Sequence, residues 1–275
     1  MKLNDKRAVI TGGAMGIGFA TAKRLLAEGC TVTIWDINGN ALAEAHEELK
    51  KSGRVYAHVC DVTDKGRVYE LAERAKAEMG GVDILINNAG FVIGGDFLER
   101  TDEEWEKTIE INLTSLVYTT RAFLKDMYLR NEGCVVNISS ASSTLGVPGL
   151  SVYTATKWAV WGLTESLRFE AISAGKRGVK FSSIHPSYIA HGLFEGAKLG
   201  FPARLIVPLI KDHDSVAKVI VERAIKKGRY SPKIPFTVNL NPRLRGLLPD
   251  SWFQHLLILL GVPEGMKGWK GRIKN

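Results

Sequence analysis

Thr11-Gly12-Gly13-Ala14-Met15-Gly16-Ile17-Gly18 is the stretch that decides the fold. It follows the apolar, strand-like segment Arg7–Thr11 and leads directly into residues 16–28, whose apolar spacing suits a helix. Glycines let the backbone approach a pyrophosphate, and a helix N-terminus offers unpaired N–H groups to an anion. Such a turn can also be a simple tight turn, but a strand before it and a helix after it favour a dinucleotide site.

The rest of the chain repeats this alternation of short apolar runs and longer segments of helical period. The expected strands are Arg7–Thr11, Thr31–Asp36, Val55–Val59, Val82–Ile86, Cys134–Ser139 and Val179–His185. The expected helices are Gly16–Glu28, Ala41–Lys51, Lys65–Met79, Glu103–Arg130 and Ser151–Ala174. We therefore expect an α/β fold with a doubly wound, mostly parallel sheet of the Rossmann type and helices on both faces. In such sheets the ligand lies beyond the carboxyl ends of the strands.

Composition argues against several classes of protein. A chain with 45% hydrophobic and 24% charged residues is an ordinary globular protein. Three cysteines, Cys30, Cys60 and Cys134, are too few for a disulfide framework or a zinc site, so we expect buried free thiols and no metal. The run Leu256–Leu260 is far shorter than the roughly 20 residues that span a bilayer. Residues 1–6 lack the features of a secretory signal.

The net charge of +8 lies almost entirely in the last part of the chain. Residues 1–191 carry a net charge of −1, whereas residues 192–275 carry +9. The main part of the chain is therefore close to neutral, and we expect it to bind no nucleic acid.

Asp36 closes the second expected strand, where a carboxylate can accept hydrogen bonds from the adenosine ribose. No Arg or Lys lies in the glycine turn or directly after Asp36, so the cation that a 2′-phosphate needs is missing and NAD is favoured. The alternative is that Asp36 is a turn residue or a helix cap. Asp61, after the third strand, could line the adenosine site or cap the next helix.

Tyr153 and Lys157 lie four residues apart in an expected helix, so their side chains share one face. A tyrosine has a pKa of about 10, and using it as a base near neutrality requires roughly 4 kcal/mol of phenolate stabilisation. One ammonium at about 4 Å supplies about 4 kcal/mol at an effective dielectric constant near 20. Ser140 follows the fifth strand, thirteen residues before Tyr153, and so adds a hydroxyl at the same end of the sheet.

These motifs together resemble the short-chain dehydrogenase/reductase family. The resemblance rests on Thr-Gly-x-x-x-Gly-x-Gly at 11–18, Asn-Asn-Ala-Gly at 87–90, Ser140 and Tyr153-x-x-x-Lys157, and covers about residues 5–190. Its ending, Met266-x-x-Trp269-Lys270-Gly271-Arg272, looks like the tails of members close to the retinol and 17β-hydroxysteroid dehydrogenases. The N-terminal membrane anchor of such relatives is not expected here.

The resemblance implies a role for each catalytic residue. Tyr153 would be the general acid/base, and Ser140 would hydrogen-bond the substrate oxygen. Lys157 would bind the nicotinamide ribose and lower the pKa of the tyrosine, and Asn112 would hold a water in the proton relay. The expected cofactor site is Thr11, Gly12, Met15, Gly16, Ile17, Gly18, Asp36, Ile37, Asp61, Val62, Asn88, Ala89, Gly90, Tyr153, Lys157, Pro186 and Ile189.

One segment departs from the family pattern. The family usually has Pro-Gly followed by a Thr that helps hold the nicotinamide, whereas this chain has Pro186-Ser187-Tyr188-Ile189-Ala190-His191. Ser187 restricts the backbone of the turn, and His191 replaces a short hydroxyl with an imidazole that contacts the cofactor or points to solvent.

The segments expected around the substrate are largely apolar, which favours a lipophilic secondary or allylic alcohol and its ketone or aldehyde. The same side chains could instead simply close the core. The expected substrate residues are Ser140, Val147, Tyr153, Tyr188, His191 and Phe194.

We expect residues 1–239 to form a single Rossmann-type catalytic domain, with a substrate-binding loop at about residues 187–211. Residues 240–275 form a basic, apolar C-terminal extension. This extension could cover the substrate cleft or pack on another subunit, rest on an anionic membrane, or bind nucleic acid. We expect a cytoplasmic homodimer or homotetramer, with peripheral membrane contact through the extension as one of these alternatives.

Two other functions stay open at this point. A 3-oxoacyl-thioester reductase is the nearest alternative enzyme, although it would be expected to use NADPH and Asp36 argues against that. A non-catalytic nucleotide-sensing scaffold on the same fold is the other alternative, because a fold alone does not fix an activity.

Overall fold

A parallel seven-stranded sheet forms the centre of the molecule. The computed structural model describes residues 1–189, 192–194, 209–264, 266 and 269. The strands are ordered β3-β2-β1-β4-β5-β6-β7, and their bounds are β1 (Arg7–Thr11), β2 (Thr31–Asp36), β3 (Val55–Val59), β4 (Ile84–Asn87), β5 (Gly133–Ile138), β6 (Val179–Pro186) and β7 (Lys233–Ile234). The order reverses between β1 and β4, where the loops diverge and leave a crevice for a ligand. The expected doubly wound α/β fold is confirmed.

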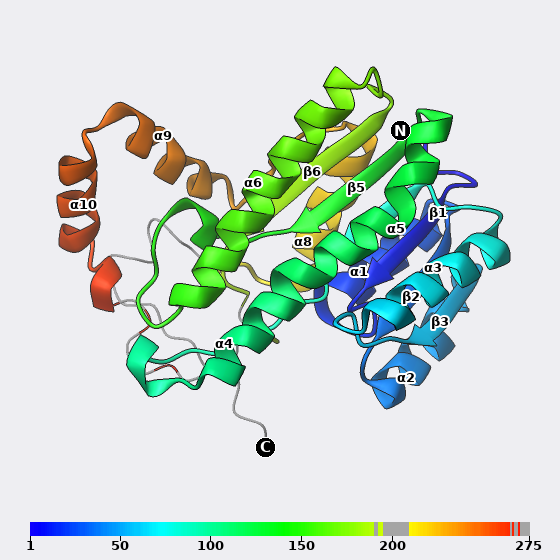
Figure 1. Ribbon diagram of the computed structural model, residues 1–275, viewed down its shortest axis with the longest axis horizontal. Helices are drawn as coiled ribbons and strands as arrows, with labels where there is room; N and C mark the ends of the chain where they lie inside the picture. Colours follow the sequence, from blue (N-terminus) through cyan, green and yellow to red (C-terminus); the bar gives the residue numbers. More distant parts are fainter. Residues whose placement is uncertain (190–191, 195–208, 265, 267–268, 270–275) are drawn as a thin grey trace.

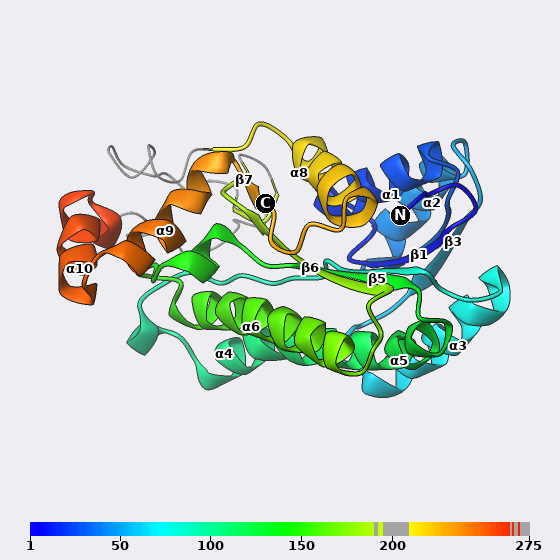
Figure 2. The same cartoon turned by 90° about the horizontal axis from the view of Figure 1, so that it is seen from above.

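Helices cover both faces of the sheet (Figure 2). On one face lie α1 (Gly16–Ala27), α2 (Gly39–Leu49) and α8 (His213–Val219). On the other lie α3 (Lys65–Met79), α4 (Asp102–Ile109), α5 (Ser115–Arg130) and α6 (Ser151–Ser173). This arrangement follows from right-handed crossovers, which change face where the strand order reverses.

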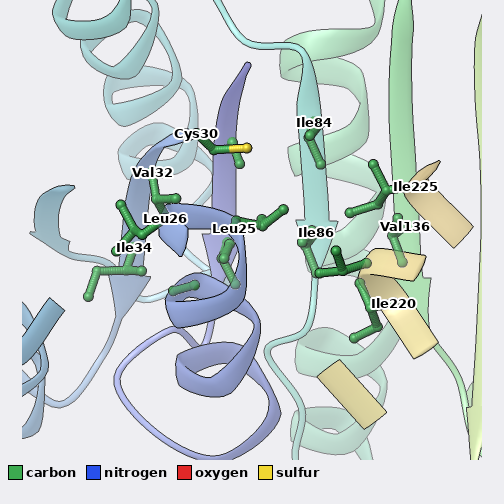
Figure 3. Close-up of a cluster of buried hydrophobic side chains, with 14 of the residues drawn as sticks. Leu25, Leu26, Cys30, Val32, Ile34, Ile84, Ile86, Val136, Ile220 and Ile225 are labelled. Atoms are coloured by element: carbon green, nitrogen blue, oxygen red, sulfur yellow. The ribbon is translucent and has the colours of Figure 1, made fainter. Parts of the chain in front are cut away.

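Each face of the sheet buries its own apolar layer. Ala8 and Ile10 of β1 belong to the layer under α1 and α2, whereas Val9 belongs to the layer under α3 and α5. This is the two-residue alternation of a strand that is buried on both sides. Figure 3 shows the first layer, where Leu25 of α1 lies near Ile86 of β4. The packed layers hold the strand ends, and therefore the loops that follow them, in fixed positions.

Helices after residue 200, among them α8 and the π-helical segment Ile220–Lys226, were not among the expected elements, and three further differences lie in the sheet and its connections. The helix expected over residues 103–130 is interrupted by a π-helical turn, Glu110–Thr114, between α4 and α5. One extra residue in such a turn leaves the apolar pattern on both sides intact, so periodicity does not reveal it. The strand expected from residue 82 begins at Ile84. β7 was not expected, because two residues are too few to carry a pattern.

The C-terminal extension begins with α9 (Leu240–Leu247) and α10 (Asp250–Leu259), which project from the layered body (Figure 1). Within the described residues, no helix is both long enough and apolar enough to cross a membrane. All three cysteines are buried and unpaired, as expected.

Candidate active site

The glycine-rich turn packs tightly on the start of α1. Gly12 and Gly16 have φ angles of 62° and 59°, in the region that favours glycine. A Cβ on Gly18 would lie 2.1 Å from the carbonyl oxygen of Gly12, so no other residue fits there without a shift. Met15, which precedes the helix, makes no side-chain cap bond. The first N–H groups of α1 can therefore bind an anion such as a pyrophosphate.

Thr11 and Asn88 join the ends of β1 and β4. The Thr11 hydroxyl accepts hydrogen bonds from the N–H groups of Asn88 and Ala89, each at 3.0 Å. Nδ2 of Asn88 donates to the carbonyl oxygens of Thr11 at 3.0 Å and Gly12 at 2.9 Å. The glycine turn and the loop after β4 therefore form one connected surface.

Asp36 joins the end of β2 to the same turn. Its Oδ2 accepts from the N–H of Ala14 and its Oδ1 from the N–H of Asn38, each at 3.1 Å. The cap of α2 is Asn38, whose Oδ1 accepts from the N–H of Ala41. The alternative that Asp36 is the helix cap is therefore wrong. The side chain of Ile37 is 65% exposed beside it and could lie against a bound adenine.

Asp61 lies farther along the edge of this surface. Its Oδ1 accepts from the N–H of Thr63 at 2.9 Å and from its hydroxyl at 2.7 Å. The cap of α3 is Asp64, so the cap explanation for Asp61 is also wrong. Val62 is buried in the layer under α3.

Ser140, Tyr153 and Lys157 meet at the carboxyl ends of β5 and β6. Ser140 and Tyr153 both line the small cavity described below, and a hydrogen bond from the Ser140 hydroxyl would stabilise the phenolate of Tyr153. The Nζ of Lys157 lies 5.6 Å from the centre of the Tyr153 ring and donates to the carbonyl oxygen of Ile138 at 3.0 Å. All three side chains are buried, and Tyr153 is only 3% exposed.

Asn112 lies in the π-helical turn between α4 and α5. Its Oδ1 accepts from the N–H of Phe91 and its Nδ2 donates to the Phe91 carbonyl oxygen, each at 2.8 Å. Nδ2 also donates to the Thr156 hydroxyl at 3.3 Å. A Cβ on Gly90 would lie 3.5 Å from Oδ1 of Asn112 and 3.9 Å from Nζ of Lys157. The amide of Asn112 therefore ties the loop after β4 to α6, next to the lysine.

Burial dominates the ionisation of both titratable groups. It raises the pKa of Tyr153 above the ordinary value, and the hydrogen bond from Ser140 opposes this only in part. Burial also lowers the pKa of Lys157 to about 8. Desolvation of both groups therefore opposes the stabilisation that the ammonium gives to the phenolate.

A buried chain of hydrogen bonds runs from Lys233 to Ser140. Nζ of Lys233 donates to Oγ of Ser231 at 2.9 Å, and Ser231 lies 2.9 Å from Nε2 of His185. Nδ1 of His185 lies 2.7 Å from Oγ of Ser143, which donates to the Ser140 carbonyl oxygen at 2.6 Å.

The carbonyl oxygen of Ser140 only accepts, so Ser143 donates to it and Nδ1 of His185 donates to Ser143. Burial lowers the pKa of His185 to about 3, so the ring is neutral and Nε2 carries no proton. Nε2 therefore accepts from the hydroxyl of Ser231. Aligned bonds of this kind polarise one another and hold the turn at Ser140 in place.

A small apolar cavity of about 30 Å³ lies beside Ser140 and Tyr153. Its lining is Ser140, Ala141, Ser142, Leu145, Val147, Leu150, Tyr153, Ser187, Tyr188 and Phe194. This volume admits a water molecule or two but no organic substrate.

Aromatic side chains fill the space next to this cavity. The Phe194 ring meets Tyr153 edge-on at 5.6 Å and Tyr188 edge-on at 5.1 Å. Met266 and Trp269 of the C-terminal extension belong to the same buried cluster. A Cβ on Gly94 would lie 2.4 Å from the Trp269 carbonyl oxygen. These two tail residues therefore pack beside the cavity, against its lining residue Phe194 and in the same cluster as Tyr153.

Comparison with known proteins identifies the family. The family model described as short chain dehydrogenase matches residues 6–198. The chain belongs to the short-chain dehydrogenase family. It is accordingly an oxidoreductase, because its relatives are named dehydrogenases.

Two curated relatives of the short-chain dehydrogenase family cover nearly the whole chain. Epidermal retinol dehydrogenase 2 of Mus musculus is 34% identical over 97% of this chain and 85% of its own. Estradiol 17-beta-dehydrogenase 11 of Rattus norvegicus is 35% identical over 96% of this chain and 87% of its own. The expected resemblance to retinol and 17β-hydroxysteroid dehydrogenases is confirmed.

Solved structures of the short-chain dehydrogenase family share the fold. A member from Burkholderia phymatum in complex with NAD has a TM-score of 0.80 and 26% identity, and the match covers 92% of this chain and 96% of that one. Another similar member was solved in complex with NADP.

The residues expected in the site from the segment after β6 do not all lie near Tyr153. Pro186 ends β6, whereas the side chain of Ile189 is buried in the layer under α1, away from Tyr153. Ser187 lines the small cavity without a positive φ, so the turn tolerates a residue other than glycine. His191 lies outside the described residues.

The sequence analysis did not single out two histidines that reach the site of this short-chain dehydrogenase. His213, the first residue of α8, lies so close to the glycine turn that a Cβ on Gly16 would be 3.5 Å from its ring. His185 reaches the turn at Ser140 through Ser143. The sequence signal for His185 was its position at the end of a strand, and the signal for Trp269 was the family-like ending of the chain.

Proposed function

We propose that this short-chain dehydrogenase is NAD-dependent and interconverts a lipophilic secondary or allylic alcohol with its ketone or aldehyde, with Tyr153 as the general acid/base. The observation that carries the proposal is the placement of Ser140 and Tyr153 side by side in the wall of an apolar cavity, with Nζ of Lys157 5.6 Å from the centre of the Tyr153 ring. The division into a catalytic domain, residues 1–239, and an extension, residues 240–275, is part of the proposal.

Each polar side chain would have a defined task. Tyr153 would give its proton to the carbonyl oxygen in reduction and remove the hydroxyl proton in oxidation. Ser140 would donate a hydrogen bond to the same oxygen as negative charge develops there. Lys157 would bind the nicotinamide ribose. Asn112 would hold the loop after β4 in place. Its side-chain amide already binds Phe91 and Thr156, so a water of the proton relay would bind next to this amide.

The cofactor would supply or accept the hydride when bound. The uncapped N-terminus of α1 and the turn at Gly12 and Gly16 fit its pyrophosphate. Asp36 stands where the adenosine ribose would lie and, within the described residues, forms no ion pair. This carboxylate would accept from the ribose hydroxyls and repel a 2′-phosphate, which supports NAD over NADP.

The charge of Lys157 would make Tyr153 a usable base. Nζ lies 5.6 Å from the ring centre, and at an effective dielectric constant near 20 a unit charge stabilises a negative charge at that distance by about 3 kcal/mol, or about two pKa units. Burial works against this gain, so the positive charge of the oxidised nicotinamide would have to supply the rest.

The lining of the cavity supports a lipophilic substrate. Leu145, Val147 and Leu150 face it, and two tail residues, Met266 and Trp269, lie in the same apolar cluster. The two curated relatives are named for retinol and for estradiol. The tail would have to shift to admit such a molecule, because only about 30 Å³ is free.

The function is tested by following NADH absorbance with a panel of alcohols and ketones. Turnover of steroid, retinoid or long-chain alcohols with NAD, and poor turnover of small polar sugars, is the expected result. Turnover of sugars alone would contradict the substrate class. Turnover with NADP alone would contradict the cofactor.

We further propose a cytoplasmic homo-oligomer, a dimer or tetramer, with peripheral membrane contact through α9 and α10. Exposed apolar side chains on these helices include Leu247, Trp252 and Leu259, and Arg243 and Arg245 lie on the same segment. Such a mixture suits an anionic membrane surface. Liposome flotation of full-length and tail-deleted protein tests the contact, and failure of both to float would reject it.

A further inference from the structure

A second hollow, of about 510 Å³, lies along the edge of the sheet formed by β7. It is lined by Arg223, Lys227, Arg229, Tyr230, Ser231, Pro232, Lys233, Phe236 and Asn239. None of these residues lines the cavity beside Tyr153. Its volume is in the range of small-molecule sites. The alcohol dehydrogenase function proposed above uses no residue of this hollow as a catalytic or cofactor-binding residue.

Four of the lining residues are cations, and none of them is neutralised. Arg223, Lys227, Arg229 and Lys233 have no carboxylate within 4 Å in the part of the chain that the structure describes. Their neighbour Lys226 behaves differently, because it pairs with two glutamates at 2.6 and 2.9 Å. Glu222 acts on Lys227, and Glu165 acts on Tyr230, without forming an ion pair with any of the four cations among the described residues. The cations around the hollow therefore present a net positive field.

Lys233 is the best defined of the four. It is only 7% exposed, and its Nζ donates to Oγ of Ser231 at 2.9 Å and lies 4.7 Å from the Trp161 ring. Burial lowers its pKa to about 8. A buried ammonium with no counter-charge is costly, and an anion in the hollow would remove that cost.

Lys233 is also held in a fixed position. Ser231 uses its own proton on His185, so its hydroxyl oxygen is aimed at the ammonium. A cation that is held before the ligand arrives loses little entropy on binding.

We propose that this hollow binds the phosphate group of a small organic phosphate, with Lys233 at its centre and Arg223, Lys227 and Arg229 around it. Guanidinium groups match phosphate oxygens in pairs, and an ammonium contributes a point charge. The rings of Tyr230 and Phe236 border the hollow and offer apolar surface to the group attached to the phosphate. The phosphate can belong to a soluble monoester or to a lipid headgroup.

Isothermal titration of the full chain with glycerol 3-phosphate tests the site. The protein is first saturated with NAD, so that phosphate does not enter the glycine turn. Lys233→Met removes the central charge and keeps most of the side-chain volume. Lys51→Met removes the same charge from an exposed lysine outside the hollow.

We expect Lys233→Met to weaken binding about tenfold or more, because it removes a charge-assisted contact, and Lys51→Met to leave it unchanged. Equal affinity in the wild type and Lys233→Met would overturn the proposal, as would no binding at all. An equal loss of affinity in Lys233→Met and Lys51→Met would also overturn it, because binding would then depend on the net charge of the protein and not on this hollow.

A second variant covers the case in which Lys233→Met does not fold. Arg223 and Arg229 are exposed, so the double variant Arg223→Met/Arg229→Met should fold. We expect it too to bind glycerol 3-phosphate about tenfold more weakly. Unchanged affinity would contradict the site.

Vesicles distinguish the two sources of the phosphate. Flotation with phosphatidic acid vesicles but not phosphatidylcholine vesicles, reversed by glycerol 3-phosphate, supports a lipid headgroup. Binding of glycerol 3-phosphate without flotation supports a soluble ligand. The proposal does not depend on alcohol turnover, so an inactive enzyme that still binds the phosphate through Lys233 would refute only the proposed function.

Discussion

Trp269 stacks on Phe194, with the ring centres 5.6 Å apart and 27° between the ring planes. Phe194 in turn meets Tyr153 edge-on. The C-terminal extension thus contacts a residue that touches the proposed acid/base, although 75 residues or more separate them in the chain. The size of the free cavity depends on this aromatic contact.

Replacing Trp269 by Ala should open the pocket to large substrates. A buried aromatic ring contributes on the order of 2–3 kcal/mol, and a large substrate must displace it. We expect kcat/KM for bulky lipophilic alcohols to rise about tenfold, with little change for short alcohols. Trp252→Ala is the matched control, because Trp252 is 67% exposed on α10. A fall in kcat/KM for bulky alcohols would mean that Trp269 helps to bind them.

Asp36→Asn should weaken the preference for NAD. The amide keeps an acceptor for the N–H of Ala14 but loses the charge that repels a 2′-phosphate. We expect the ratio of kcat/KM for NAD to that for NADP to fall by about tenfold or more. Asp61→Asn, at the edge of the same surface, should change this ratio much less. An unchanged ratio in Asp36→Asn would show that Asp36 does not select NAD over NADP.

Alcohol oxidation should rise with pH through the neutral and mildly alkaline range. Oxidation needs the phenolate of Tyr153, and burial raises the pKa of this group above its ordinary value. While Lys157 keeps its charge, below about pH 8, the phenolate fraction grows about tenfold per pH unit, and the rise should become shallower above that pH as the lysine loses its proton. Ketone reduction needs the phenol and stays nearly constant. In Lys157→Met, kcat/KM for the alcohol should be lower and its rise should move to higher pH. The same profile in both proteins would show that Lys157 does not act on Tyr153.

The chain from Lys233 to Ser140 should matter for both stability and turnover. Ser143→Ala breaks two of its bonds, and we expect a loss of about 1–3 kcal/mol in the free energy of unfolding together with a lower kcat. Ser183→Ala is the control, because the Ser183 hydroxyl on β6 is buried and has no hydrogen-bond partner among the residues that the structure describes. Chemical denaturation and steady-state kinetics measure both quantities. Equal changes in stability and kcat in the two variants would show that the hydrogen bonds from Lys233 to Ser140 have no special role.

Local sequence patterns predicted most of the fold and predicted which residues would lie together in the site. Strand and helix periods were intact, and Asp36, Asn88, Ser140 and Pro186 all follow or end strands, so a parallel sheet had to bring them to one edge. The helix caps are Asn38 and Asp64, whereas the sequence analysis allowed Asp36 and Asp61 as alternatives, because several nearby polar residues can serve as a cap.

What the sequence could not reveal depends on distant contacts. β7 consists of two residues that form a strand because β6 offers a free edge, with His185 opposite Lys233. Trp269 reaches the cavity only after the chain has folded. The burial that raises the pKa of Tyr153 comes from several elements at once, and a calculation on one charged pair omits it.

Tyr153→Phe tests the central claim most directly, because it removes one oxygen and keeps the ring that packs against Phe194. Turnover of the best alcohol is measured by NADH absorbance, and NAD affinity is measured separately by calorimetry. We predict that kcat falls by about 100-fold or more while the Kd for NAD changes little, since the variant loses only the proton-transfer group. Turnover equal to that of the unchanged protein would contradict the account.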